Sequence, residues 1–300
     1  MDKRSSLFIL ITLLLLTGFS ALSEAGEIIA IKSAEIKPYN DALEGFKTSC
    51  NNDVSEVVMT EADSSDILRK VHESGTLAVF AIGMDALNLA RSVREIPVIY
   101  AMVPHSHAPN SSQKPLSGVS MYIAPDRYID SMLDVFQGAK RIGVIYDPKN
   151  SETYIKEAMQ SAQGRGVELV IRKASRPSDI PALVDSMKDK IDVFWMLPDT
   201  TVVNPETVKY LLLFSFQNKV PIFTFSKKYV EMGSTAGLYT APFDIGVQAG
   251  EIARKLVSEK NPKTIKTDAR RTVLAVNRKI IKKFGIRVRD DILNRAEHVD

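Results

Sequence analysis

Two polar residues that could recognise charged groups follow predicted strands in opposite halves of the sequence: Ser33 and Asp199. Ser33 lies just before a predicted helix whose first turn presents free backbone N–H groups and the positive end of the helix dipole, so a carboxylate could be held there. Asp199 directly follows the segment IDVFWML and could pair with an ammonium, but an aspartate in such a position also often caps a helix or turn. Thr200 and Thr201 offer further donors. Together these residues predict a ligand that carries both charges, as an amino acid does.

Other candidates come from the ends of the remaining predicted strands, because ligands of open parallel sheets bind beyond the carboxyl ends of the strands. Those positions are held by Gly83, Met84, Asp85, Met102, Tyr146 and Ser226. Aromatic residues in predicted loops could line the site and contact an apolar or aromatic group of the ligand. They are Tyr39, Tyr122, Tyr146, Phe225, Tyr239 and Phe243. Trp195 lies inside a strand predicted to be buried on both faces and is interpreted as a core residue.

Signatures of enzymes are missing from these candidate loops. The sequence has no strand followed by G-x-G-x-x-G, no G-x-x-x-x-G-K-[ST] and no H-E-x-x-H. His105 and His107 have a spacing that can bind a metal, but no third ligand is found, so an exposed loop is the preferred interpretation. His72 and His298, in a helix and in the tail, offer no obvious base. We therefore predict no catalytic residue, no metal and no cofactor, and a protein that is not an enzyme.

The elements that would position these residues alternate along the first half of the chain. Short apolar segments such as EIIAIKS, VSEVVMT, LAVFAIG and IPVIYAMV are separated by helical patterns such as YNDALEGFKTSC and MDALNLARSVR. Strands of five to seven residues that are apolar on both faces and separated by helices indicate a parallel sheet covered by helices on both sides.

The same order then repeats in the second half. The segment KRIGVIYDPKNSETYIKEAMQ matches the first strand, polar loop and helix, and VELVIRKA, IDVFWMLPD and VPIFTFS supply further strands. Two similar α/β lobes explain this repeat better than one long sheet, because single cores stop growing near this size. The later segments, a helix at 245–258 and a strand at 272–277, would complete the sheets. We expect crossings between the lobes near 117–126 and 237–244, with a cleft between them.

The N-terminus and the overall charge limit the location and the partners. Residues 1–25 have a basic start, an apolar run from Leu7 to Leu22 and a small-residue exit, which predicts a cleavable signal peptide; an uncleaved anchor is the alternative. Cys50, the single cysteine, lies too far along to carry a lipid at the mature N-terminus and rules out an internal disulfide. The 39 Lys and Arg against 36 Asp and Glu give a charge of +3, which does not favour nucleic acid as a partner.

Several segments, taken in order, resemble one family. SAEIKPYNDALEGF, GVSMYIAPDR, AKRIGVIYDPKNS, IDVFWMLPDTTVVNPE, VPIFTFSKKYVEMGS and FDIGVQAGEIA are similar to substrate-binding proteins of ABC importers with the type I periplasmic binding fold, in the branch that binds tryptophan or tyrosine. The resemblance extends from Glu27 to about Leu293. It implies two three-layer α/β/α lobes with parallel sheets and a three-segment hinge, divided as 26–121 plus 241–267 and 122–240 plus 268–300.

The resemblance also implies a function. It implies a monomeric, non-enzymatic receptor in the periplasm that closes on a small solute, an amino acid and possibly an aromatic one, and hands it to a membrane permease. The Ser33 loop, Asp199, Ser226 and Asp244 are the positions expected to touch or frame the ligand, although Asp244 fits a helix cap better. The second hypothesis is a ligand-binding sensory module that signals to a membrane receptor. It requires the same fold and the same sequence features as a transport receptor. A hydrolase on the same frame is the third hypothesis, and it lacks a histidine base.

Overall fold

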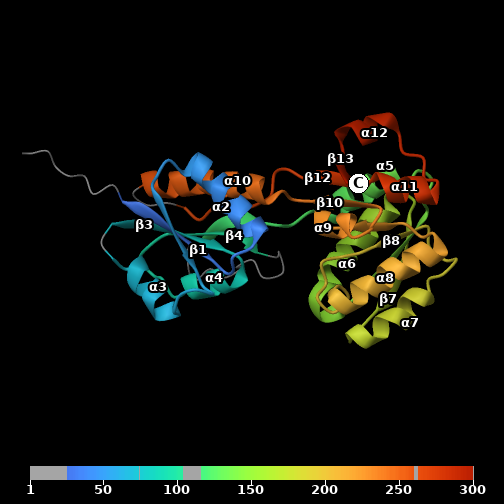
Figure 1. The fold of residues 1–300 in the computed structure, drawn as a ribbon, viewed down its shortest axis with the longest axis horizontal. Coiled ribbons are helices and arrows are strands. Elements are labelled where there is room, and N and C mark those ends of the chain that lie inside the picture. The colour runs from blue at the N-terminus through green and yellow to red at the C-terminus, as the bar shows by residue number, and fades with distance from the viewer. Residues whose placement is uncertain (1–25, 74, 104–115, 260–262, 300) are drawn as a thin grey trace, which may run out of the picture.

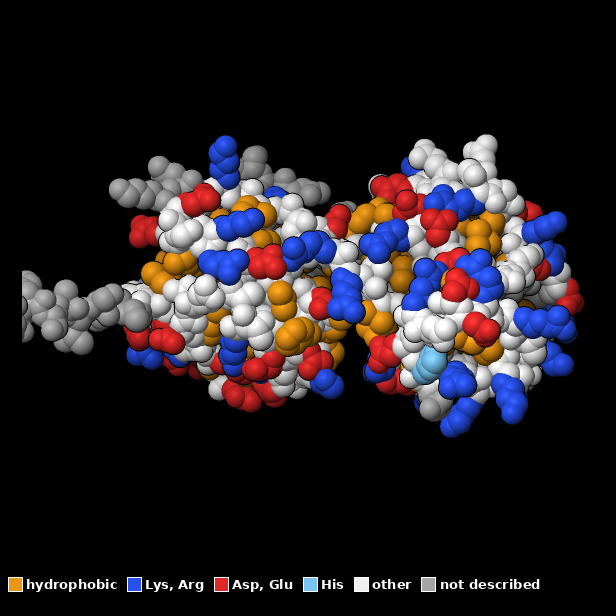
Figure 2. Space-filling view, turned by 90° about the horizontal axis from the view of Figure 1, so that it is seen from above, with side chains coloured by type: hydrophobic (Ala, Val, Ile, Leu, Met, Phe, Trp, Pro, Cys, Tyr) orange, Lys and Arg blue, Asp and Glu red, His pale blue; other side chains and the backbone are white. Residues whose placement is uncertain are grey.

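The structure is a computed structural model that describes residues 26–73, 75–103, 116–259 and 263–299. The chain forms two α/β lobes that lie side by side (Figure 1) and meet at a narrow waist (Figure 2). The predicted signal peptide and the pair His105 and His107 lie outside the described residues. Within the part of the chain that is described, no helix is both long and apolar enough to cross a membrane.

The first lobe contains a six-stranded sheet of order β11-β5-β4-β3-β1-β2, in which all neighbours are parallel. Helices α2 and α10 cover one face, and α3 and α4 cover the other (Figure 1). The elements are β1 (Glu27–Lys32), α2 (Lys37–Cys50), β2 (Val54–Val58), α3 (Ser64–Val71), β3 (Thr76–Ile82), α4 (Met84–Ala90), β4 (Val98–Val103), β5 (Leu116–Ser120), α10 (Pro242–Ser258) and β11 (Lys266–Asp268).

The second lobe contains a seven-stranded sheet of order β13-β12-β10-β9-β8-β6-β7, in which β10 and β12 alone pair antiparallel among the described strands. One core lies under α5 and α6, and a second lies under α7 and α8. The elements up to the second crossing are α5 (Pro125–Val135), β6 (Arg141–Tyr146), α6 (Pro148–Gln163), β7 (Glu168–Lys173), the 3-10 helix η2 (Pro177–Asp179), α7 (Ile180–Asp185), β8 (Val193–Trp195), α8 (Pro205–Asn218), β9 (Ile222–Thr224), α9 (Lys227–Glu231) and β10 (Ala236–Tyr239). The C-terminal elements are β12 (Val273–Asn277), α11 (Arg278–Phe284), α12 (Asp290–Arg295) and β13 (Glu297–Val299).

This architecture confirms the predicted fold class, two α/β lobes with mainly parallel sheets. Trp195 is completely buried in the core under α5 and α6, as predicted. Strands β8 and β9 are shorter than the predicted apolar segments, with only three residues each. Helix α5 and the strands β11 and β13 were not predicted. The C-terminal segment forms two short helices, α11, which buries Ile280 and Ile281, and a separate α12.

The chain passes between the two sheets three times, and every crossing is attached to a carboxyl edge. It leaves the first sheet at the ends of β5 and β11 and leaves the second sheet at the end of β10. It re-enters the second sheet at the start of β12, which lies beside the end of β10 because these two strands are antiparallel. The carboxyl edges of both sheets are therefore joined by the crossings and face the waist, where a parallel sheet presents its ligand-binding loops.

Helices α2 and α10 pack closely in the first lobe, in parallel orientation. A Cβ atom at Gly246 would lie 1.9 Å from the Ala42 carbonyl oxygen, and one at Gly45 would lie 2.1 Å from the Phe243 carbonyl oxygen. At Gly250 it would meet the Ser49 hydroxyl at 2.2 Å. The absence of side chains at these positions therefore lets the two backbones touch, which places the first turns of both helices at the carboxyl edge of the sheet.

Candidate ligand-binding cleft

On the first lobe, Ser33 lies at the carboxyl end of β1 and is buried. Its hydroxyl donates to the Ile82 carbonyl at 3.1 Å and accepts from the Ala86 N–H at 2.9 Å, in the first turn of α4. The sequence predicted Ser33 at the start of the next helix along the chain, α2, but the structure places it against α4. The Ser33 loop and α4 are therefore fixed to each other before any ligand arrives.

Tyr39 and Gly83 complete this corner of the first lobe. Gly83 has φ +93°, and a Cβ atom there would lie 2.6 Å from both the Ser33 and the Tyr39 hydroxyl oxygens. Only glycine fits this position, both in conformation and in space. Burial, and to a smaller extent the charge of Asp85, raises the pKa of Tyr39. The Tyr39 hydroxyl has no hydrogen-bond partner among the described residues, so the corner presents a neutral donor toward the edge of the sheet.

Met84 and Asp85 follow Gly83 in the first turn of α4. Met84 is half-buried and packs at the edge of the core under α3 and α4, whereas Asp85 is exposed. The structure thus brings Ser33, Tyr39, Met84 and Asp85 to one corner of the carboxyl edge.

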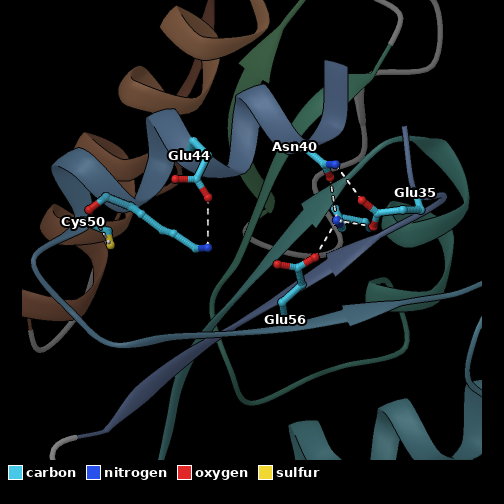
Figure 3. A network of polar contacts seen from close by, with 7 residues as sticks. Glu35, Asn40, Glu44, Cys50 and Glu56 are labelled. Atoms are coloured by element: carbon cyan, nitrogen blue, oxygen red, sulfur yellow. Dashed lines mark hydrogen bonds and ion pairs between the residues drawn. The ribbon is translucent and has the colours of Figure 1, made fainter. Parts of the chain in front are cut away.

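A buried lysine beside this corner was missed by the sequence analysis. The Lys32 ammonium contacts Glu35 and Glu56 at 2.5 Å and the Asn40 amide oxygen at 2.6 Å, which Figure 3 shows. Burial opposes the charge of Lys32, but the hydrogen bonds to Glu35 and Glu56 outweigh it and raise the pKa of the lysine. The bonds from Lys32 and then Asn40 hold the pKa of Glu35 below its usual value. The sequence around Lys32 does not indicate that its side chain is buried. Its partner Glu56 lies on another strand, β2, and only the pairing of β1 with β2 brings the two residues together.

On the second lobe, Asp199 lies at the carboxyl edge beyond β8 and is only 1% exposed. Its carboxylate accepts hydrogen bonds from the backbone N–H groups of Asp147 at 2.9 Å and Thr201 at 3.0 Å. It also accepts from the Asn150 amide at 3.1 Å and the Ser151 hydroxyl at 2.8 Å. These four neutral donors use both carboxylate oxygens, so an ammonium could reach Asp199 only by displacing one of them.

A second buried carboxylate lies beside Asp199. Asp147 caps α6 by accepting from the Lys149 N–H at 2.9 Å, and it also accepts from the Thr201 hydroxyl at 2.8 Å. The Lys149 bond first, and the Thr201 bond second, lower the pKa of Asp147. Thr200 is exposed at the same edge. The region therefore carries two buried negative charges held mainly by neutral donors.

Tyr146 and Ser226 also lie at this edge of the second lobe. The buried Tyr146 donates to Glu152 at 2.7 Å, and its burial together with this bond raises its pKa to about 12. Ser226 is half-buried at the N-cap of α9, where its side chain makes no capping hydrogen bond. The Tyr146 hydroxyl is therefore already bound to a carboxylate, whereas the Ser226 hydroxyl is not used as a cap.

Tyr122 and Asp244 lie at the crossings rather than on either sheet edge. Tyr122 donates to Glu157 at 2.6 Å, and burial followed by this bond raises its pKa. The cap of α10 is Ala241, so the interpretation of Asp244 as the capping residue is wrong. Asp244 lies in the first turn instead, 3.5 Å from Arg271 on the third crossing, beside a small hollow of about 140 Å³.

A larger hollow of about 520 Å³ opens on the opposite side of the second lobe. It is lined by residues at the starts of β6 and β7, among them Lys140, Arg141 and Glu168. This is the amino edge of the sheet, away from the crossings, so we do not assign the ligand to it. Among the described residues, no group of three or more His, Cys, Asp and Glu side chains is arranged to hold a metal ion.

The C-terminal strand β13 is attached to the second crossing through Glu297. This carboxylate accepts hydrogen bonds from Lys227, next to Ser226, and from the Tyr239 hydroxyl at the end of β10. The Lys227 bond first, and the Tyr239 bond second, hold the pKa of Glu297 below its ordinary value. The last strand therefore links the Ser226 loop to the hinge.

This link should make part of the stability depend on pH. Because the pKa of Glu297 is lower in the folded state, its contribution is present above the ordinary value of 4.5 and is lost as the pH falls through the folded pKa. We expect Glu297→Gln to lower the free energy of unfolding by about 1 kcal/mol at neutral pH, and by progressively less in acid. Urea unfolding between about pH 7 and pH 3 checks this. Glu61→Gln, at an exposed glutamate with no ion pair among the described residues, is the control, and an equal pH response in both variants would contradict the prediction.

Comparison with known proteins agrees with this geometry. A tyrosine-binding protein of Clostridioides difficile is 25% identical over 240 residues, which are 77% of this chain and 68% of that protein. The ligand-free, open structure of a substrate-binding protein with adhesive properties from Clostridium difficile has a TM-score of 0.78 at 19% identity, covering 92% of this chain and 99% of that one. An ABC domain from Streptococcus pneumoniae in complex with L-Trp has a TM-score of 0.64 at 20% identity, covering 91% and 100%.

The solved structures show the fold, and the family follows from the sequence match. The family model described as "ABC transporter substrate binding protein" matches residues 30–300, nearly the whole described chain. Members of this family are substrate-binding proteins rather than enzymes. With two α/β lobes joined at their carboxyl edges and this match over both of them, the chain belongs to the family of ABC transporter substrate-binding proteins.

Proposed function

We propose that this protein is the extracytoplasmic receptor of an ABC importer and that its two lobes close on an amino acid, with an aromatic one as the first candidate. The observation that carries the proposal is the pair of carboxyl edges that the three crossings hold opposite each other. Loops from both edges can then contact one solute, and closure is favoured by the extra contacts made only in the closed form.

The chemistry of the two edges supports a zwitterionic ligand. The second lobe carries the buried carboxylates Asp147 and Asp199, whose field favours an ammonium group nearby. The first lobe presents the Tyr39 hydroxyl, a neutral donor that could bind a carboxylate, beside the exposed Asp85, whose charge would favour an ammonium. The relatives named for tyrosine and in complex with L-Trp make these two amino acids the first to test.

The proposed ligand-contacting set keeps the residues predicted from the sequence, with changed roles for two of them. Asp199 acts by holding Thr201 and the start of α6, and Asp244 acts through Arg271 at the hinge. Ser33, Tyr39, Met84, Asp85, Tyr122, Tyr146, Thr200 and Ser226 remain the proposed lining of the cleft.

The remaining parts of the proposal follow the family. The lobes comprise 26–121 plus 241–267 and 122–240 plus 268–300, and residues 1–25 direct export to the periplasm. The exported protein is a monomer that catalyses no reaction, and its partner is the membrane permease that receives the solute. No nucleic acid takes part.

A thermal-shift screen of the purified mature protein against the twenty amino acids tests the proposal. A ligand that binds only the folded state stabilises it by about 2.7 kcal/mol at a concentration one hundred times its Kd. We expect a rise in Tm with L-tyrosine or L-tryptophan and none with sugars or nucleosides. The radius of gyration should fall on addition of the same amino acid, measured by small-angle X-ray scattering. A screen in which no amino acid raises the Tm would refute the amino-acid assignment.

A further inference from the structure

Lys32 is an unusual residue to find at the end of a central strand. Its side chain is 2% exposed, whereas its partners Glu35 and Glu56 keep 48% and 38% of theirs. Taking a charge out of water is unfavourable unless it is paired and hydrogen-bonded, so a buried lysine at such a position has to be fully partnered. An apolar residue at this position could pair in the strand and pack in the core without needing charged partners.

The contacts of Lys32 join three separate segments. Its three N–H donors reach Glu35 in the β1–α2 loop, Asn40 in the first turns of α2, and Glu56 on β2, at 2.5, 2.6 and 2.5 Å respectively. The Asn40 amide in turn donates to Glu35 at 2.6 Å, which closes a ring around the ammonium. Figure 3 shows Glu35, Asn40 and Glu56 arranged around one ammonium group, with dashed lines for these contacts.

The neighbouring residue holds the same loop from the other face of the sheet. Successive side chains of a strand point to opposite faces, and Ser33 accordingly bonds to Ile82 and Ala86 on the α4 side. The β1–α2 loop, defined as residues 33–36, is thus fixed on both faces at its base. Beyond this base, Ile36 is 44% exposed at the start of α2, at the carboxyl edge that faces the other lobe.

We infer that Lys32 is a positioning residue for ligand binding: by holding Glu35 and Asn40 it fixes the β1–α2 loop, and with it Ser33 and Tyr39, in the conformation that receives the solute. The part of this inference that concerns ligand affinity rests on the proposed function. Lys32 itself does not touch the ligand, because its ammonium is enclosed by protein partners. A loop fixed before binding loses less conformational entropy when the ligand arrives, which favours affinity.

Hydrogen–deuterium exchange on the full mature protein tests the positioning role without a ligand. In Lys32→Met, which keeps the length of the side chain but removes its charge, amides 33–41 should exchange at least about tenfold faster than in the wild type, while β3 and β4 stay protected. Glu35→Ala, at a half-exposed side chain, breaks the same ring and leaves Lys32 paired with Glu56, so it should reproduce the local effect even if Lys32→Met folds poorly. Arg141→Met is the matched control, because its 2.7 Å pair with Asp192 lies at the amino edge of the other lobe.

Affinity for L-tyrosine and L-tryptophan, measured by calorimetry, completes the test. Both loop variants should bind at least about tenfold more weakly than the wild type, and Arg141→Met should bind normally. Unchanged exchange at residues 33–41, or faster exchange spread over the whole first lobe, would overturn the inference. If the wild type binds neither amino acid, the aromatic ligand of the proposed function fails while the exchange result still decides the role of Lys32.

Discussion

Replacing Gly246 with alanine is expected to lower the free energy of unfolding by about 3 kcal/mol, because overpacked contacts between fixed backbones are among the costlier core changes. The new Cβ would lie 1.9 Å from the Ala42 carbonyl oxygen, 2.7 Å from its carbonyl carbon and 2.9 Å from the Phe46 nitrogen. These are backbone atoms of α2, which cannot rotate away as a side chain can. Helices α2 and α10 would have to separate, and the core of the first lobe would lose contacts along both.

Gly164→Ala supplies the control for this prediction. Gly164 ends α6 with φ −63° and ψ −15°, and the nearest atoms to an added Cβ lie 3.8 Å away. Alanine there should be neutral or stabilise by about 0.5 kcal/mol, because it restricts only the unfolded chain. Urea unfolding of both variants at one pH gives the comparison. If Gly246→Ala lost no more stability than Gly164→Ala, the two helices would not be in the close contact that the structure shows.

The fold could be predicted from the sequence because the signal is local and repeated. Strand β1 is buried along almost its whole length, and an apolar run of this length between two helical patterns is typical of a strand in a covered parallel sheet. The same pattern in both halves predicted two lobes, and the position of Trp195 within such a run predicted its burial. Strand β11 could not be predicted, since its sequence Lys266–Asp268 has no apolar character and pairs with β5 only because the chain returns there.

The candidate site was less predictable because its contacts join residues that are distant in sequence. Lys32 looks like a solvated strand end, and only the register that sets β2 beside β1 reveals Glu56 as its partner. Asp199 was correctly placed at a carboxyl edge, but its donors Asn150 and Ser151 belong to α6, the helix that follows the neighbouring strand β6. A sequence pattern can thus indicate which edge carries the polar groups, but it does not indicate which of them are already occupied by one another.

Asp199→Ala should lower the free energy of unfolding by about 3 kcal/mol, because it leaves buried donors around the former carboxylate without an acceptor. The N–H groups of Asp147 and Thr201 belong to the backbone and cannot rotate toward another acceptor, whereas the Ser151 hydroxyl can. Asp199→Asn should cost less, about 1.5 kcal/mol, since it keeps one acceptor and the packing but points an amide group at other donors. Urea unfolding of both variants checks the order of the two losses.

The same variants separate the two roles that Asp199 can have. If Asp199 only holds the loop and the start of α6, then Asp199→Asn keeps most of the amino-acid affinity measured by calorimetry, and its effect appears in stability. If it also pairs directly with a ligand ammonium, both variants should in addition bind the amino acid more weakly by about 1.5 to 3 kcal/mol. The four neutral donors already bound to the carboxylate favour the first result. The second would require the ligand to replace Asn150 or Ser151, the two donors on side chains that can move.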